Sequence, residues 1–244
     1  MMPLTPRYDA SRMTRLICGF WLMLLCSLCF AQQAELPRFE GRQITVDAPK
    51  LDDDGLFFVE GKDGASVCIE GPPIRQCYTG PKEYGRVSTA EVIEIGKDKS
   101  ALLFSASSNG VSGWEVHFAL LRPGAGGVLD NLFLGGINIA NQNQHRFLDE
   151  PSFSAARIFV TAEFVWGRDE GHYGPHRFVI SAYAIRPSLE GDNSDLYYLQ
   201  DRYMTARTYD LDAGADILAA EKPEILARLR RVKAEQDRQP HSDR

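Results

Sequence analysis

The pattern of hydrophobic and polar residues between Leu56 and Arg186 predicts an all-β domain. Short runs rich in β-branched and aromatic residues alternate with turn residues at intervals of roughly 8 to 14 positions, and helical periodicity is absent from this stretch. Turns such as Gly96-Lys97-Asp98-Lys99 join neighbouring runs, so we expect an antiparallel meander of hairpins that forms a sandwich or a barrel-like domain. The predicted strands are Leu56–Glu60, Ala65–Glu70, Ile74–Thr79, Val87–Ile95, Ala101–Ser105, Trp114–Arg122, Val128–Leu134, Arg157–Trp166 and Arg177–Arg186.

The pattern inside each run predicts how deeply the strand lies. In Trp114–Leu120 the apolar residues alternate with Glu115 and His117, so this strand should be half buried, with His117 pointing away from the core. The runs Ile158–Trp166 and Phe178–Ile185 are apolar on both faces, which predicts central strands that are covered on both sides. We expect these two strands to pair as the core hairpin.

The chain changes character towards its C-terminus. After Asp195, alternating aromatic and polar residues as far as Leu211 predict two short strands or one bent strand. An amphipathic helix should follow from about Glu221 to Gln236, with Pro223 in its first turn. A basic cluster on this helix is interpreted as a solvated face, because the apolar stripe of the same helix should face the domain. The cluster consists of Arg228, Arg230, Arg231 and Lys233.

Composition sets the remaining boundaries. Residues 32–55 are polar and contain prolines and an acidic run, which predicts a lead-in segment with one edge strand at Gln43–Val46. Residues 56–236 should form a single β-rich domain that ends in the helix, because no repeat or low-complexity linker divides them. Residues 237–244 are predicted to be a disordered tail.

Residues 1–31 have the features of a signal peptide. Arg7, Arg12 and Arg15 form a positive region, and the almost wholly apolar run Leu16–Phe30 follows it. This run is about 15 residues long, shorter than the roughly 20 residues that cross a bilayer, so a cleaved signal peptide is favoured over a membrane anchor. Cleavage after Ala31 would leave no apolar segment long enough to span a membrane. We therefore expect a periplasmic or secreted protein.

The charge of the chain argues against nucleic acid as a partner. The net charge is −6, and removal of residues 1–31 leaves 24 basic and 32 acidic residues, or −8. Phosphate backbones are bound by a dense positive field, which an acidic chain could supply only through a local basic patch. Because 44% of the residues are hydrophobic, the chain can form an ordinary folded core. The expected partner is a protein or a glycan of the cell envelope.

Two cysteines remain after cleavage, Cys68 and Cys77. They flank the turn Gly71-Pro72-Pro73, so they should face each other across a hairpin. An even pair in an oxidising compartment favours a disulfide bond over free thiols. A structural role is favoured over a redox role, because the close Cys-x-x-Cys spacing that lowers a thiol pKa is absent.

The loop Gly167–His176 is the main candidate site, because it carries many reactive side chains between the two strands that we expect to be most central. Its residues could supply metal ligands or a general acid and base. Gly174 and Pro175 forbid a regular helix between the two histidines, so a structural loop is favoured over a metal site and no metal is assigned. The predicted binding residues are Trp166, Asp169, His172, Tyr173, His176 and Arg177.

A second polar patch extends from Asn138 to His145. Its uncharged amides can read sugar hydroxyls, particularly beside an aromatic ring such as Phe147 or Trp166. A plain surface loop is favoured, because asparagine is an ordinary turn residue.

The sequence contains no nucleophile elbow, phosphate loop, dinucleotide fingerprint or zinc-protease motif. The leading hypothesis is therefore an exported binding or interaction protein without a cofactor. The alternative is a metal-dependent or acid/base hydrolase that acts on an extracytoplasmic substrate through the 167–176 loop. A third hypothesis is a structural role in which the C-terminal helix docks onto a partner.

Overall fold

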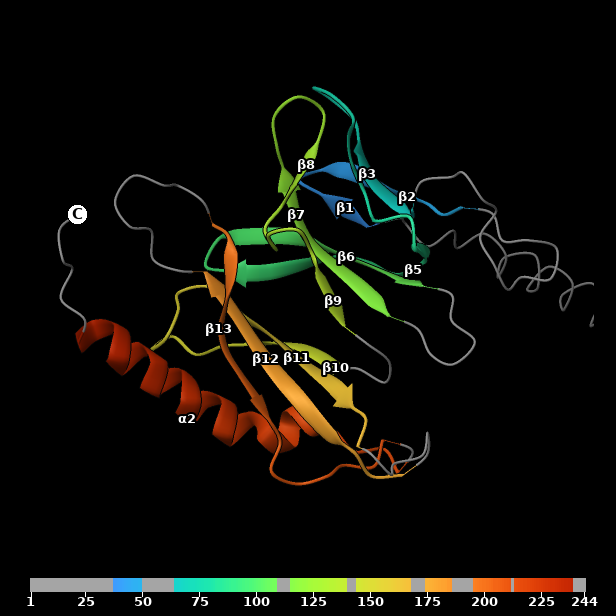
Figure 1. The fold of residues 1–244 in the computed structure, drawn as a ribbon. Coiled ribbons are helices and arrows are strands. Elements are labelled where there is room, and N and C mark those ends of the chain that lie inside the picture. The colour runs from blue at the N-terminus through green and yellow to red at the C-terminus, as the bar shows by residue number, and fades with distance from the viewer. Residues whose placement is uncertain are drawn as a thin grey trace, which may run out of the picture. The chain divides into compact units, whose positions relative to one another are not determined.

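A computed structural model describes residues 37–49, 64–108, 115–139, 144–167, 174–185, 195–211 and 213–238. These residues form 13 strands in three antiparallel sheets and a single helix, α2, near the C-terminus (Figure 1). The prediction of a mostly β fold with hairpin meanders and one C-terminal helix is confirmed. The predicted strand Leu56–Glu60 lies outside the described residues.

The three sheets follow one another along the chain. The N-terminal sheet consists of β1 (Arg38–Phe39), β2 (Arg42–Asp47), β3 (Ser66–Glu70) and β4 (Gln76–Thr79). The middle sheet consists of β5 (Tyr84–Gly96), β6 (Lys99–Ser108), β7 (Val116–Pro123) and β8 (Leu129–Asn131), and β9 (Ile137–Ile139) also pairs with β7. The C-terminal sheet consists of β10 (Gln144–Leu148), β11 (Ile158–Val165), β12 (Arg177–Ile185) and β13 (Tyr197–Met204).

Three hydrophobic cores hold these layers together. One joins the N-terminal sheet to the middle sheet, where Ile44 packs in the same cluster as Phe104. The second joins the opposite face of the middle sheet to the C-terminal sheet, with Phe118 against Phe159 at 5.6 Å between ring centroids. The third lies between the C-terminal sheet and one side of α2 (Ile217–Arg238). The domain is thus two sandwiches that share the middle sheet, with a helix as the last layer.

The predicted core hairpin is confirmed. β11 and β12 pair in register from Phe159↔Tyr183 to Val165↔Arg177. Phe159 lies in the core shared with the middle sheet, whereas its neighbour Val160 lies in the core under α2. This hairpin is apolar on both faces because each face packs against a different layer.

The prediction that His117 points away from the core is wrong. Its strand β7 is covered on both sides, and only 1% of His117 is exposed. The side chain does lie on the face opposite Phe118, but the N-terminal sheet covers that face. Alternation along one strand shows which residues share a face, but it does not show whether a second sheet packs against the polar face.

The helix begins earlier than predicted. It starts at Ile217 and not near Glu221, so Pro223 lies inside it and not in its first turn. Asp216 caps the N-terminus, because its carboxylate accepts a hydrogen bond from the Ala219 amide at 2.9 Å. Within the described part of the chain, no helix is long and apolar enough to cross a membrane.

Candidate functional site

A cleft lies where the tip of the β5–β6 hairpin approaches the segment between β10 and β11. Gly96 forms an isolated antiparallel bridge with Ala156, and the Arg157 amide donates a hydrogen bond to the Ile95 carbonyl at 2.7 Å. A Cβ at Gly96 would lie in van der Waals contact, 3.4 Å from the Ala155 carbonyl oxygen, so the two backbones pack directly against each other. The predicted 96–99 turn is present, with Asp98 at a positive φ of 57°.

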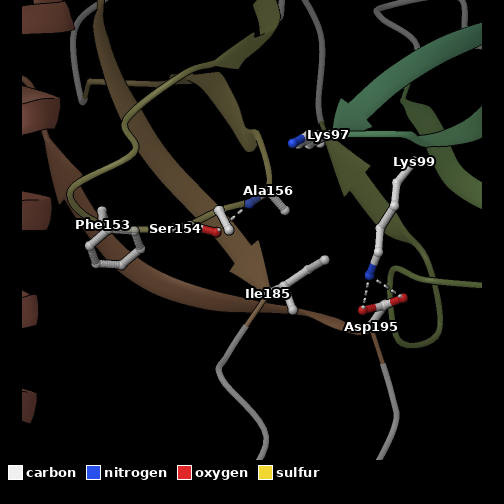
Figure 2. Close-up of a pocket in the computed structure, with 9 residues that line it drawn as sticks. Lys97, Lys99, Phe153, Ser154, Ala156, Ile185 and Asp195 are labelled. Carbon is white, nitrogen blue, oxygen red and sulfur yellow. Dashed lines mark hydrogen bonds and ion pairs between the residues drawn. The ribbon is translucent and has the colours of Figure 1, made fainter.

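The cleft has a volume of about 320 Å³ and combines apolar walls with polar side chains. Figure 2 shows Lys97 and Lys99 from the hairpin tip opposite Phe153, Ser154 and Ala156. The lining consists of Gly96, Lys97, Lys99, Phe153, Ser154, Ala155, Ala156, Ile185 and Asp195. The apolar part of this lining is formed by an aromatic ring, a branched aliphatic side chain and two alanines. Small-molecule sites commonly have this character, with mostly apolar walls and a few placed polar groups.

Ion pairs occupy one side of the cleft. Lys99 Nζ donates to both carboxylate oxygens of Asp195 at 3.1 and 3.2 Å, and Arg122 Nη1 donates to the same carboxylate at 3.3 Å. In contrast, Lys97 forms no hydrogen bond or ion pair with any described residue. Ser154 Oγ accepts a hydrogen bond from the Ala156 amide at 3.1 Å, which leaves its own hydroxyl hydrogen available.

A second cleft of about 400 Å³ adjoins the first and shares Gly96, Lys97 and residues 154–156 with it. Its remaining lining is Glu94, Asp149, Glu150, Pro151 and Arg157. Most of these charges are engaged. Arg157 pairs with Asp149 at 3.2 Å, and Glu150 pairs with Arg230 of α2 at 3.2 Å. A hydrogen bond from Ser152, followed by the one from Arg230, lowers the pKa of the Glu150 carboxyl.

The predicted loop site is only partly described. Asp169, His172 and Tyr173 lie outside the described residues. Trp166 and His176 come together around Phe164, with ring centroids 4.8 and 4.2 Å from it. Trp166 is 51% exposed, whereas His176 is 2% exposed and exchanges two backbone hydrogen bonds with Tyr209.

Arg177 does not join this aromatic group. It pairs with Val165, so both side chains lie on the face of the C-terminal sheet opposite Phe164 and Phe178. The structure therefore divides the described candidate residues between two faces of one sheet.

The amide patch is also partly described, and its described amides bond within the protein. Asn138 Oδ1 accepts a hydrogen bond from His117 Nδ1 at 2.6 Å. The Gln144 side chain accepts from the Ile217 amide at 2.8 Å and donates to the Ala215 carbonyl at 2.8 Å, which fastens the start of α2. The residues between them, 140–143, lie outside the described part of the chain.

A buried polar chain between the N-terminal and middle sheets was not predicted. His117 Nε2 lies 2.8 Å from the Tyr78 hydroxyl, and Tyr84 donates to Glu115 at 2.7 Å beside the same imidazole. Burial lowers the pKa of His117 and raises the pKa of Tyr78, so both groups are held neutral. A neutral phenol and an imidazole that is 1% exposed provide neither a nucleophile nor an accessible base.

A third hollow, of about 760 Å³, lies between β13 and α2. At its base the Glu221 carboxylate accepts hydrogen bonds from the hydroxyls of Tyr203 and Tyr209 and lies 3.6 Å from Arg207. The carboxylate is therefore fully partnered, and this arrangement is best explained as an attachment of the helix to the sheet.

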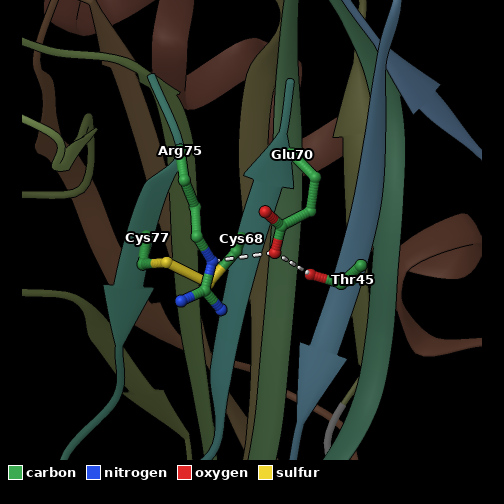
Figure 3. The surroundings of a disulfide bond; sticks show 5 residues. All are labelled: Thr45, Cys68, Glu70, Arg75 and Cys77. Atoms are coloured by element: carbon green, nitrogen blue, oxygen red, sulfur yellow. Dashed lines mark hydrogen bonds and ion pairs between the residues drawn. A yellow bond between two sulfur atoms is a disulfide. The ribbon is translucent and has the colours of Figure 1, made fainter. Parts of the chain in front are cut away.

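The predicted disulfide is present. Cys68 of β3 and Cys77 of β4 are cross-strand partners and are bonded (Figure 3). Beside the bridge, the Glu70 carboxylate accepts hydrogen bonds from Arg75 at 2.8 Å and from Thr45 at 3.0 Å. These contacts tie the disulfide hairpin to β2.

Among the described residues, no group of three or more His, Cys, Asp or Glu side chains is arranged to hold a metal ion. The first cleft is therefore the best candidate site, because it combines the apolar walls of Phe153 and Ile185 with the cation of Lys97, which is unpaired within the described chain. Comparison of the chain with protein-family models, with curated proteins and with solved structures found no match.

Proposed function

We propose that this protein is an exported, non-enzymatic binding protein and that the cleft between the β5–β6 hairpin tip and residues 153–156 holds its ligand. The observation that carries the proposal is the composition of this cleft. Phe153 and Ile185 provide apolar surface, while Lys97 provides a charge that no described residue neutralises. Concave sites with these two elements are the usual form of a small-molecule binding site.

Export is supported by two independent features. The N-terminal residues have the charge and hydropathy pattern of a signal peptide. The Cys68–Cys77 disulfide belongs to a kind of bond that persists outside the reducing cytosol.

A binding role is favoured over the hydrolase alternative by the side chains that line the cleft. Catalysis by acid and base needs groups that can exchange a proton near neutral pH. Among the described lining residues, the Asp195 carboxylate is engaged by Lys99 and Arg122, and no histidine lines the cleft with Ser154. These groups suit recognition better than proton transfer.

A ligand screen tests the proposal. The mature protein should be heated with small organic acids, amides, amines and oligosaccharides, and a true ligand should raise the melting temperature in proportion to its concentration. The same ligand should lose most of this effect on Phe153→Ala, which removes the aromatic wall. The proposal fails if the ligands that stabilise the protein act equally on Phe153→Ala and on wild type, or if the protein turns its ligand over.

A further inference from the structure

Among the described residues, the polar side chains that line the first cleft are mostly hydrogen-bond donors, namely Lys97, Lys99 and Ser154. From this we infer that the ligand is a small organic anion, a carboxylate carried on an apolar body. The inference rests on the proposed function, and it assigns the anionic group to Lys97 and Ser154 and the apolar body to Phe153 and Ile185.

The donors converge from opposite walls. Lys97 carries three N–H donors and no partner within the described chain, and it comes from the hairpin tip. Ser154 faces it from the 149–157 segment, and its hydroxyl hydrogen is available because its oxygen already accepts the Ala156 amide. A carboxylate has two oxygens that only accept hydrogen bonds, so it can use both donors at once.

The acceptors of the cleft are already occupied. Asp195 is the one carboxylate among the described lining residues, and it accepts hydrogen bonds from Lys99 and Arg122 together. A cationic ligand would meet Lys97 and find Asp195 engaged elsewhere, so its charge would be repelled without compensation. The excess of positive charge around the cleft therefore selects for a negative ligand.

The apolar walls limit the rest of the ligand. A volume of about 320 Å³ is near the lower end of ordinary ligand sites, which span roughly 300 to 1,000 Å³, so the ligand should be small. Phe153 offers a ring face or edge, and Ile185 and the two alanines offer aliphatic surface. The desolvated apolar body supplies affinity, and the carboxylate supplies orientation.

The neighbouring cleft directs the anion to the first one. Besides Lys97 and Arg157, its described lining contains three carboxylates, Glu94, Asp149 and Glu150, and the lowered pKa of Glu150 keeps that carboxyl ionised. Carboxylates outnumber cations in that described lining, whereas Lys97 and Lys99 outnumber Asp195 in the first cleft. The anionic end should therefore bind beside Lys97 on the side of Phe153.

Three probes of similar shape and different charge test the inference. Phenylacetate, neutral phenylacetamide and phenethylammonium should be titrated separately into the mature protein at neutral pH, with binding followed by NMR chemical shifts. Phenylacetate should bind at least about tenfold more tightly than phenylacetamide, and phenethylammonium should bind most weakly. Raising the salt concentration should weaken the binding of phenylacetate and leave the binding of phenylacetamide unchanged.

Matched variants test whether Lys97 recognises the negative charge of the ligand. Lys97→Met keeps the length of the side chain and removes its charge, so it should abolish the preference for phenylacetate over phenylacetamide. Lys82→Met, which changes an exposed lysine outside the cleft lining, should leave that preference intact. Phe153→Ala should weaken the binding of both phenylacetate and phenylacetamide.

The outcomes separate the two claims. If phenylacetate and phenylacetamide bind equally and both depend on Phe153, or if phenethylammonium binds best, the anion inference is overturned while the binding site stands. If no probe and no compound in the wider screen depends on Phe153, the proposed function is overturned as well.

Discussion

The Tyr78 hydroxyl donates a hydrogen bond to His117 Nε2 across 2.8 Å, from the N-terminal sheet to the middle sheet. The direction follows from the other side of the ring. Asn138 Oδ1 can only accept, so His117 Nδ1 must carry the hydrogen of the neutral imidazole, and Nε2 is left as an acceptor. Protonation of His117 would place a second hydrogen at Nε2 and oppose the bond from Tyr78. The packing of these two sheets is thus linked to the charge of one buried histidine.

Stability should fall as the pH drops below about 6.5, the ordinary pKa of histidine. Burial lowers the pKa of His117 in the folded protein, so the unfolded chain takes up a proton that the folded protein does not. Stability from this group is therefore complete above the unfolded pKa and is lost as the pH falls from there towards the folded pKa. Denaturant titrations between pH 8 and pH 5 measure the effect. His117→Gln should flatten this dependence, and an identical slope in wild type and variant would contradict the assignment.

Gly136 should be the most sensitive glycine of the 135–136 turn. It adopts a φ of +86°, and a Cβ there would lie 2.2 Å from His117 Cε1. Gly136→Ala combines backbone strain with a steric clash in a buried site, and we expect a loss of about 3 kcal/mol or more. Gly135→Ala is the matched control, because Gly135 has a φ of +76° with open space around it. It should cost only about 1 to 2 kcal/mol. Equal losses of unfolding free energy in the two variants, measured by chemical denaturation, would show that the His117 side chain can move aside at little cost.

Removal of the disulfide should weaken the fold without abolishing it. Cys68→Ser should lower the free energy of unfolding by about 2 to 3 kcal/mol, because the reduced unfolded chain gains freedom while the three cores remain. Cys77→Ser should give the same loss, since both variants remove one bond. An unchanged denaturation midpoint in either variant would show that the bridge contributes nothing to stability.

Gln144 should behave as part of the helix start. Gln144→Ala removes acceptors from the Ile217 and Leu218 amides and a donor to the Ala215 carbonyl. We expect a loss of about 1 to 2 kcal/mol, the range of a helix cap. Gln144→Glu keeps the acceptors and loses the donor, so it should be less harmful. If Gln144→Ala unfolds at the wild-type denaturant concentration, the hydrogen bonds at this terminus are replaced by water without cost.

The sequence predicts much of this fold and little of its site, for different reasons. Alternation and turn residues are local signals, and they place the β11–β12 hairpin and the Cys68–Cys77 bridge correctly. The burial of His117 depends on a sheet that comes from distant residues, so alternation along β7 could not reveal it. The start of α2 could have been predicted, because aspartate is a common N-cap residue and Asp216 precedes the helix. Pro223, taken as a first-turn residue, placed the predicted start too late in the sequence.

The cleft could not be predicted for a related reason. Its hairpin turn is recognisable in the sequence, but nothing local to Lys97 indicates that Phe153 and Ser154 lie opposite it. A chemically rich loop such as 167–176 stands out in a sequence because its residues are neighbours in the chain. A site built from four separate stretches of the chain has no such signal.

His176 and Arg177, two neighbouring candidate site residues, should differ in their contribution to stability. Because His176 is 2% exposed and packs its ring 4.2 Å from Phe164, His176→Ala should lower the free energy of unfolding by about 1 to 3 kcal/mol. Arg177→Ala alters the next residue, whose exposed side chain lies on the other face of β12, and should change stability by no more than about 0.5 kcal/mol. Denaturant titration of both variants against wild type measures the difference. If His176→Ala keeps the wild-type midpoint but no longer binds a ligand, the histidine contributes to binding. The 167–176 loop would then be a second candidate binding site besides the cleft. If stability falls as expected, His176 is a packing residue, and any ligand contact of this loop must come from its other side chains.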